Sequence, residues 1–202
     1  MINENLKLRF ATKHDANKLL NIYAPYVKHE DSSLSDVSFE YIVPGAIEFA
    51  ERIRDIGSKY PYIVLERDGV IVGYCYAHPY IQRAAYQWSA ETTIYIALEE
   101  RQKGYGWILY NALERLLVLM GITNVYACIA GNNEDSIQMH AALHYKLNGE
   151  FKQCAFKNGH WLDMVWMEKV LQEHKPQPEL IKSIKDIDPF QIEIIFEDMV
   201  NC

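Results

Sequence analysis

The stretch from residue 88 to residue 130 most strongly constrains how this chain can fold. Residues 88–96 are rich in Thr, Ile and Tyr and predict a strand, residues 105–120 have helical spacing, and residues 124–130 alternate like a second strand. The apolar face of the helix is predicted to consist of Leu109, Ala112, Leu113, Leu116 and Met120. Parallel strands need a long crossover connection, which is right-handed in nearly all proteins. The sequence therefore predicts a right-handed parallel strand–helix–strand unit.

The residues before this unit predict a strand, two helices and a hairpin. Residues 6–10 alternate, and residues 12–15 resemble a capping box for a helix. The apolar positions of that helix are Ala16, Leu19, Leu20, Tyr23 and Val27. After an irregular polar loop over 28–40, Pro44 suits the first turn of a second helix that stops at Gly57. Its inward positions are predicted to be Ile47, Ala50, Ile53 and Ile56. Asp68-Gly69, between two β-rich runs, predicts a tight hairpin.

The residues after the unit predict a short helix and a closing antiparallel pair. Asn133 or Asp135 can cap a helix that runs to about residue 143. Residues 150–156 and 161–171 predict two strands joined at 157–159. A proline-containing linker at 175–178 divides the chain into a domain over 1–172 and a C-terminal extension over 173–202. The whole order predicts an α/β fold with a mixed central sheet and helices on its faces.

Charge and cysteine usage exclude several classes of protein. The 202 residues include 27 acidic and 20 basic side chains, a net charge of −7, which disfavours a non-specific nucleic-acid binder. The four cysteines lack metal-ligand spacing, which is typical of reduced thiols in the cytoplasm. No apolar run approaches the about 20 residues of a membrane span. We therefore expect a cytoplasmic protein with no nucleic-acid partner and no membrane contact.

The glycine-containing loop at 101–106 is the sharpest functional signal. It reads Arg-Gln-Lys-Gly-Tyr-Gly and lies between a predicted strand and a strong helix. Glycines there let a ligand approach the backbone, and the free N–H groups at a helix start bind phosphate. The loop is not a dinucleotide fingerprint, because Leu109 occupies the third glycine position, and no Gly-Lys-Ser/Thr follows as in a P-loop. An ordinary glycine turn remains the alternative interpretation.

Arg-x-x-Gly-x-Gly in this context resembles the acetyl-CoA pyrophosphate loop of the GNAT N-acetyltransferases. Over about residues 6–171, the chain resembles the phosphinothricin and methionine sulfoximine acetyltransferases in particular. The residues that carry this resemblance are Ile22-Tyr23, Ser38-Phe39-Glu40, Tyr60-Pro61, Gly73-Tyr74, Arg83-Ala84-Ala85-Tyr86, Trp88, Glu91, Ile94-Tyr95-Ile96, Asn133-Glu134-Asp135-Ser136, His140, Leu143-His144-Tyr145 and Trp161-x-Asp163.

The resemblance implies a GNAT-like mixed sheet that splays between the parallel strands at 91–96 and 124–130, with acetyl-CoA as co-substrate in the opening. It implies that the backbone of Ile94, Tyr95 and Ile96 holds the pantetheine, which Asn133 also reaches. The pyrophosphate would be held by the loop residues Gln102, Lys103, Gly104, Tyr105, Gly106 and Trp107.

Glu91 and His140 are the candidate catalytic residues. An amine must lose a proton before it attacks, and the resemblance favours Glu91 as that base. His140 is expected either to protonate the departing thiolate or to act as the base itself, and the sequence leaves both roles open. His140 and His144 have the i, i+4 spacing of zinc ligands, but there is no HExxH glutamate and no third ligand. We therefore expect no metal.

Arg83 is a candidate ligand for a substrate carboxylate or phosphinate, because a guanidinium pairs with such groups bidentately. Phe39, Tyr86 and Trp88 are candidate walls for a small amino-acid-like side chain. The leading hypothesis is direct acetyl transfer to such an amine in a ternary complex, since no cysteine is among the proposed catalytic positions. Alternatives are acetylation of a protein N-terminus or a polyamine, or a non-catalytic acetyl-CoA-binding module. Dimerisation is typical of the resembled enzymes, so a homodimer is also expected.

Overall fold

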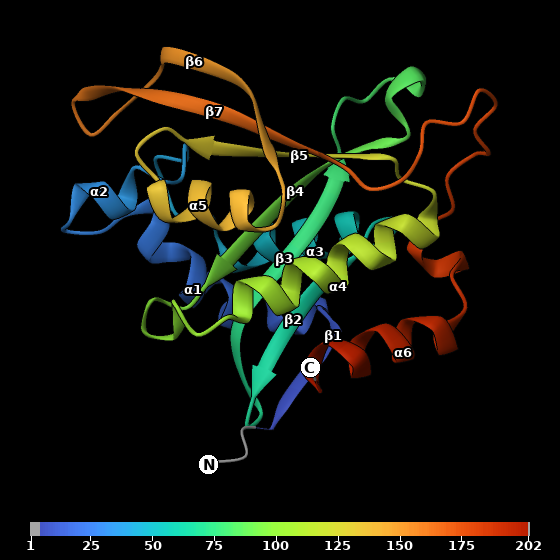
Figure 1. Ribbon diagram of the computed structural model, residues 1–202. Coiled ribbons are helices and arrows are strands. Elements are labelled where there is room, and N and C mark those ends of the chain that lie inside the picture. The colour runs from blue at the N-terminus through green and yellow to red at the C-terminus, as the bar shows by residue number, and fades with distance from the viewer. Residues whose placement is uncertain (1–4, 202) are drawn as a thin grey trace.

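The computed structural model describes residues 5–201 and contains one seven-stranded sheet with helices on both faces (Figure 1). The strand order is β1-β2-β3-β4-β5-β7-β6. The strands are β1 Leu6–Phe10, β2 Tyr62–Arg67, β3 Val70–Pro79, β4 Ser89–Ile96, β5 Asn124–Ala130, β6 Lys146–Lys157 and β7 His160–Val170. The helices are α1 Ala16–Val27, α2 Ser32–Ser35, α3 Ala46–Gly57, α4 Tyr105–Met120, α5 Glu134–Ala142 and α6 Pro189–Val200. Short 3₁₀ turns lie at Lys13–Asp15, Ala84–Tyr86, Leu98–Glu100 and Ile184–Asp186.

The single parallel pair in this sheet is β4 with β5, as the sequence predicts. The two strands pair only from Ser89 opposite Asn124 to Glu91 opposite Tyr126. Beyond Glu91 both strands continue without pairing to each other, and Figure 1 shows them spreading apart toward α5. The sheet therefore forks at Glu91. This confirms the predicted splayed mixed sheet.

Each face of the sheet has its own hydrophobic core. All five predicted inward positions of α4 are almost completely buried, together with Val125, Ala127 and Ile129 of β5. On the other face, α1 and α3 pack Leu19, Tyr23 and other residues against β2 and β3. The predicted apolar faces of α1, α4 and β5 are thus confirmed, with Leu20 only partly buried.

The second helix differs from its predicted face. Ile47 is 81% exposed, and Phe49, which the pattern left out, is buried with Ile53 four residues further on. Pro44 precedes the helix, which begins at Ala46. Successive helical residues are about 100° apart, so Ile47 lies about 200° around the helix from Phe49. The prediction for Ile47 is therefore wrong, because the helix buries the face that carries Phe49 and Ile53. The segment 28–40 is not wholly irregular either, since it contains the one-turn helix α2.

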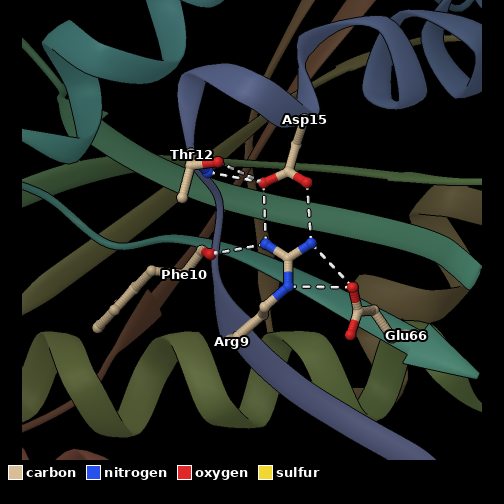
Figure 2. A network of polar contacts seen from close by, with 5 residues as sticks. All are labelled: Arg9, Phe10, Thr12, Asp15 and Glu66. Atoms are coloured by element: carbon tan, nitrogen blue, oxygen red, sulfur yellow. Dashed lines mark hydrogen bonds and ion pairs between the residues drawn. The ribbon is translucent and has the colours of Figure 1, made fainter. Parts of the chain in front are cut away.

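The turns and caps near the N-terminus form as predicted. Asp68 and Gly69 both have positive φ values, 52° and 81°, as a two-residue hairpin turn requires. Figure 2 shows the Arg9 guanidinium donating to both carboxylate oxygens of Asp15 at 2.8 Å and to Glu66 at 2.8–3.0 Å. Asp15 also accepts from the backbone N–H of Thr12 at 2.8 Å, which closes the predicted capping box. The Arg9 hydrogen bonds lower the pKa of Asp15 to about 2 and fasten β1 to the start of α1.

The closing hairpin is longer than the sequence pattern indicates. β6 begins at Lys146 rather than at residue 150, and its pairing with β7 is interrupted twice, between Leu147 and Gly149 and between Phe151 and Ala155. These bulges break the alternation of apolar residues along β6, which is why the pattern underestimates its length.

The C-terminal extension packs against α4 and β1 (Figure 1). Ile184, Ile187, Ile195 and Met199 are buried in the same core as α4. At its start, the indole N–H of Trp88 donates to the backbone carbonyl of Glu179 at 2.8 Å. Within residues 5–201, no helix is both long enough and apolar enough to cross a membrane.

Candidate active site

A cleft of about 460 Å³ lies where β4 and β5 separate. Its walls are residues 92–96 of β4 and 127–130 of β5, and the rest of the lining comes from α4, α5, the loop before α4 and single residues such as Tyr26 of α1. Because the strands have stopped pairing here, their facing edges carry backbone N–H and C=O groups with no strand between them. Such edges can pair with an extended, amide-containing ligand. Nine of the ten predicted cofactor-binding residues line this cleft, and Lys103 does not.

The glycine loop at the mouth of the cleft has the conformation of an anion site. Gln102 and Gly104 are both left-handed, with φ values of 61° and 84°, and Gly104 is the N-cap of α4. The first backbone N–H groups of any α-helix have no acceptor in a preceding turn, and here they lie at the start of α4 beside the cleft. Successive N–H groups in such a turn, at the positive end of a helix dipole, attract phosphate.

The charged residues of this loop are held in ion pairs. Glu100, directly before the loop, is buried and accepts from the Arg67 guanidinium through both oxygens at 2.7 Å. The Lys103 ammonium also donates to Glu100, at 2.8 Å, so its charge is already paired. Arg101 forms an ion pair with Asp135 in the first turn of α5 and thereby links the two sides of the opening.

Gly106 allows a close approach between two helices. A Cβ atom at this position would lie 2.7 Å from the sulfur of Met139 in α5. The sequence predicts close contact between this glycine and a ligand. The structure adds contact with α5 as a second reason for its small size. Asn133 is the cap of α5, because its side-chain oxygen accepts from the N–H of Ser136 at 3.2 Å.

His140 is buried on the cleft side of the sheet, with 2% of its surface exposed. Its Nδ1 lies 2.7 Å from the carbonyl of Ser136, which can only accept, so Nδ1 carries the proton. Its Nε2 therefore accepts from the hydroxyl of Tyr110 at 2.8 Å. Burial lowers the pKa of His140 to about 4, so the ring is neutral near pH 7. Tyr110 also lies 3.3 Å from Thr92 Oγ1, and the three side chains connect α5, α4 and β4.

Glu91 lies on the opposite face of the sheet from His140. Successive strand residues point to opposite faces, and Thr92 contacts Tyr110 on the α4 face. Glu91 therefore faces the other side, at the last paired position before the fork, with its Oε1 3.8 Å from Nε2 of His78. Burial raises the pKa of Glu91, and the charge of His78 opposes that shift. The two candidate catalytic side chains therefore lie near the fork but on opposite faces of the sheet.

None of the four predicted substrate residues lines the cleft. Arg83 is exposed and Tyr86 is 40% exposed, both in or beside the turn between β3 and β4. Trp88 is half-buried and holds the C-terminal extension, while Phe39 is half-buried in the segment after α2. The structure brings the cofactor candidates together and leaves the substrate candidates outside the cleft, on separate segments of the chain.

Several lining residues were not found from the sequence. Tyr26 donates to the carbonyl of Ile96 at 2.6 Å, and Tyr110 positions His140. Cys128 lines the β5 wall, and burial raises the pKa of its thiol to about 12, which keeps it protonated. A tyrosine within an otherwise apolar helix face was the available signal for Tyr110. Across residues 5–201 there is no cluster of three or more His, Cys, Asp or Glu side chains that could hold a metal ion.

The forked sheet and the glycine loop at the start of α4 define the class of the protein. The family model described as "Acetyltransferase (GNAT) domain" matches residues 8–166, and the chain belongs to this family. This confirms the resemblance inferred from the sequence, the fold class and the enzyme class, that of N-acetyltransferases with acetyl-CoA as co-substrate.

Similar proteins agree with that assignment. The phosphinothricin N-acetyltransferase of Streptomyces viridochromogenes is 28% identical over 182 residues, which cover 90% of this chain and 96% of that protein. The L-methionine sulfoximine/L-methionine sulfone acetyltransferase of Salmonella typhimurium is 27% identical over 169 residues, covering 84% and 96%. The crystal structure of a phosphinothricin acetyltransferase from Sinorhizobium meliloti in complex with AcCoA superposes with a TM-score of 0.79 at 32% identity, covering 88% of this chain and 94% of that one.

Proposed function

We propose that this protein transfers the acetyl group of acetyl-CoA to the amino group of a small amino-acid-like substrate, of the phosphinothricin, methionine sulfoximine or methionine sulfone type. The observation that carries the proposal is the cleft between the forked strands, with the left-handed glycine loop at its mouth. The names of the relatives support the substrate class.

The cleft fits the co-substrate in shape and chemistry. The turn around Gly104 and the start of α4 present N–H groups suited to a pyrophosphate. The edges at Ile94, Tyr95 and Ile96 suit the amides of a pantetheine arm, and Asn133 lies on the opposite wall. When bound, acetyl-CoA supplies the activated acetyl group.

Glu91 is the residue that we propose as general base. A substrate amine titrates at roughly 8 to 10, so its nitrogen is mostly protonated near neutral pH. Glu91 lies at the fork, on the face of the sheet opposite α4. A substrate amine that approaches the fork from this face can give its proton to Glu91. Its raised pKa makes it a stronger base than an exposed glutamate.

His140 acts on the thiolate side in this proposal. Its Nε2 accepts a hydrogen bond in the resting state and its pKa is about 4, so near pH 7 the ring has no proton on Nε2 to donate. We assign stabilisation of the leaving thiolate by a hydrogen bond to the hydroxyl of Tyr110, which lines the cleft beside Thr92. In that step the hydroxyl turns its hydrogen from His140 Nε2 to the sulfur, and until then His140 holds the hydroxyl in place.

Transfer is proposed to be direct, in a ternary complex. Among the cysteines within residues 5–201, Cys128 alone lines the cleft, and a protonated thiol is a weak nucleophile. An acetylated enzyme intermediate is therefore not part of the proposal.

Glu91→Gln, His140→Ala and Tyr110→Phe test these roles. If Glu91 moves the proton, its variant should lose roughly 10²–10⁴ in kcat while acetyl-CoA binding, followed by calorimetry, survives. Tyr110→Phe and His140→Ala should show similar losses, because they disable the same pair. Wild-type turnover in all three variants with the best amine would show that the roles are wrong.

Arg83 is proposed to pair with the acidic group of the substrate from the turn beside β4. A charged hydrogen bond of this kind is worth roughly 1.5–3 kcal/mol, or about tenfold to hundredfold in kcat/KM. The measurement is kcat/KM for methionine sulfone against an uncharged amine of similar shape, in wild type and Arg83→Ala. An unchanged ratio would assign Arg83 to the solvated surface.

We also propose that the protein works in the cytoplasm as a homodimer. Free thiols persist in that reducing compartment, and Cys75, Cys128 and Cys154 are free. β6 is an edge strand of the sheet, and its Leu147 and Phe151 are exposed by 63% and 50%, which supports contact with a second copy. Light scattering at micromolar concentration tests the dimer, and a monomer mass at all concentrations would contradict it.

A further inference from the structure

His78 of β3 and Glu91 of β4 lie opposite each other on neighbouring antiparallel strands. The β3–β4 register places them directly opposite, and their closest atoms, His78 Nε2 and Glu91 Oε1, are 3.8 Å apart. Directly opposite residues in an antiparallel pair project from the same face of the sheet. The side chain of Glu91 is 22% exposed and that of His78 is 32% exposed, so His78 has the better access to water.

The backbone fixes the tautomer of the His78 ring. Nδ1 lies 3.1 Å from the carbonyl oxygen of Pro79, and a carbonyl can only accept, so Nδ1 carries the hydrogen. In the neutral ring, Nε2 therefore presents a lone pair toward Glu91. That nitrogen is free to receive a proton from the carboxyl group, and a small rotation of either side chain closes 3.8 Å to hydrogen-bond distance.

We propose that His78 is a positioning residue for Glu91 and the site that takes over the proton of the substrate amine. The proposal rests on the proposed function, in which Glu91 is the base. The N–H bond of the substrate ammonium breaks and an O–H bond forms on Glu91. That O–H bond then breaks as an N–H bond forms at Nε2 of His78. The cationic ring lies beside the regenerated carboxylate and releases the proton to water, and no electrons are transferred.

The surroundings of Glu91 make His78 its electrostatic partner. The groups that face or electrostatically interact with Glu91 are His78 and Tyr76 from β3, Tyr126 and Cys128 from β5, and Tyr110 from α4. Burial raises the pKa of each of these tyrosines and of the thiol, so all four are neutral near pH 7. Among these groups, all within residues 5–201, His78 is the one whose positive charge lowers the pKa of Glu91.

The sign of the effect follows from that charge. A cation beside a carboxylate lowers the carboxyl pKa, and His78 opposes the upward shift that burial imposes on Glu91. Removing the imidazole raises the pKa of Glu91, so a higher pH is needed to ionise the base. The acid limb of the kcat/KM profile should therefore move to higher pH.

The experiment compares pH profiles of kcat/KM for wild type, His78→Gln and His78→Phe, with His14→Gln as the matched control. His14 is an exposed histidine in the turn between β1 and α1. His78→Phe keeps a ring beside Tyr76, whose centroid lies 6.1 Å from that of His78, and so preserves the packing. Both His78 variants should be several-fold less active than wild type at pH 9, where the loss of the proton acceptor acts, and should lose still more at pH 6, where the shifted acid limb adds to it. The control should follow wild type at both pH values.

A carbon-detected NMR titration of the Glu91 carboxyl, without any substrate, separates this proposal from the proposed function. The Glu91 pKa should be higher in both His78 variants than in wild type and unchanged in His14→Gln. If wild type transfers no acetyl group but the titration shows this shift, the proposed function fails and the pair stands. If Glu91 titrates identically in wild type and in a folded His78 variant, or the loss of activity is the same at every pH, the proposal is overturned.

Discussion

The hydrogen bonds between Arg9 and Asp15 predict a specific loss of stability on replacing Asp15 with Asn. Asp15 accepts two hydrogen bonds from Arg9 and one from the backbone of Thr12, and its side chain is 8% exposed. Asn keeps the shape and removes the charge. The Arg9 guanidinium then loses the charge and one of the two acceptor oxygens opposite it, and keeps Glu66 and the carbonyl of Phe10.

The magnitude follows from the pKa. The pKa of Asp15 is lowered from 3.8 to about 2 in the folded protein. A lowered carboxyl pKa means that folding stabilises the ionised carboxylate relative to the unfolded chain. At about 1.4 kcal/mol per pH unit, the carboxylate contributes about 2 kcal/mol at pH 7. This contribution is fully present above pH 3.8 and is lost as pH falls through the folded-state value of about 2. Near pH 3 about half of it remains.

Urea unfolding at pH 7 and at pH 3 measures both quantities. We expect Asp15→Asn to lower the free energy of unfolding by about 2 kcal/mol at pH 7 and by about half as much at pH 3. Asp55→Asn is the control, because Asp55 is 66% exposed in its pair with Arg54 and should change stability by less than about 0.5 kcal/mol. A stability difference between wild type and Asp15→Asn that is the same at both pH values would refute this reasoning.

Three further outcomes follow from the structure. Gly106→Val should push Met139 toward the cleft and raise the KM for acetyl-CoA more than that for the amine; calorimetry showing unchanged acetyl-CoA affinity in the folded variant would contradict this. Cys128→Ala should keep most activity and show initial-rate patterns of a ternary complex, since its thiol stays protonated; abolished turnover with intact acetyl-CoA binding would point to a covalent intermediate instead. Deletion of residues 173–202 should lower the free energy of unfolding by more than about 5 kcal/mol, because it removes Ile184, Ile195 and other buried side chains from the core; a stable truncated protein would show that the extension is dispensable.

The sequence contained enough information for the architecture because local patterns and the global fold agree there. The helix over 105–120, the strand over 124–130 and the turn at Asp68-Gly69 each have the periodicity or turn chemistry of the final structure. The face of α3 was harder to predict, because both Ile47 and Phe49 can begin an apolar stripe and only the packing of the helix against α1 and the sheet decides between them. The bulges of β6 likewise depend on pairing with β7, which no local pattern shows.

The candidate site was predictable only where a motif is contiguous. The loop at 101–106 and the cap at Asn133 could be found in the sequence because their chemistry depends on neighbouring residues. The contact of His78 with Glu91 depends on strand register, and that of Tyr110 with His140 depends on how α4 packs against α5. The hydrogen bond from Trp88 to the extension had no signal at all, because it joins residues 91 positions apart.

The most direct test of the central claim is a thiol-release assay with acetyl-CoA over a panel of amines. The panel contains free amino acids, methionine sulfone, methionine sulfoximine, phosphinothricin, a polyamine and a peptide with a free N-terminus, with mass spectrometry of each product. We expect thiol and acetylated amine in equal amounts, with the highest kcat/KM for the amino-acid-like sulfone, sulfoximine or phosphinate. Preference for the polyamine or the peptide would contradict the proposed substrate class. Tight acetyl-CoA binding without thiol release from any amine would contradict the proposed catalysis.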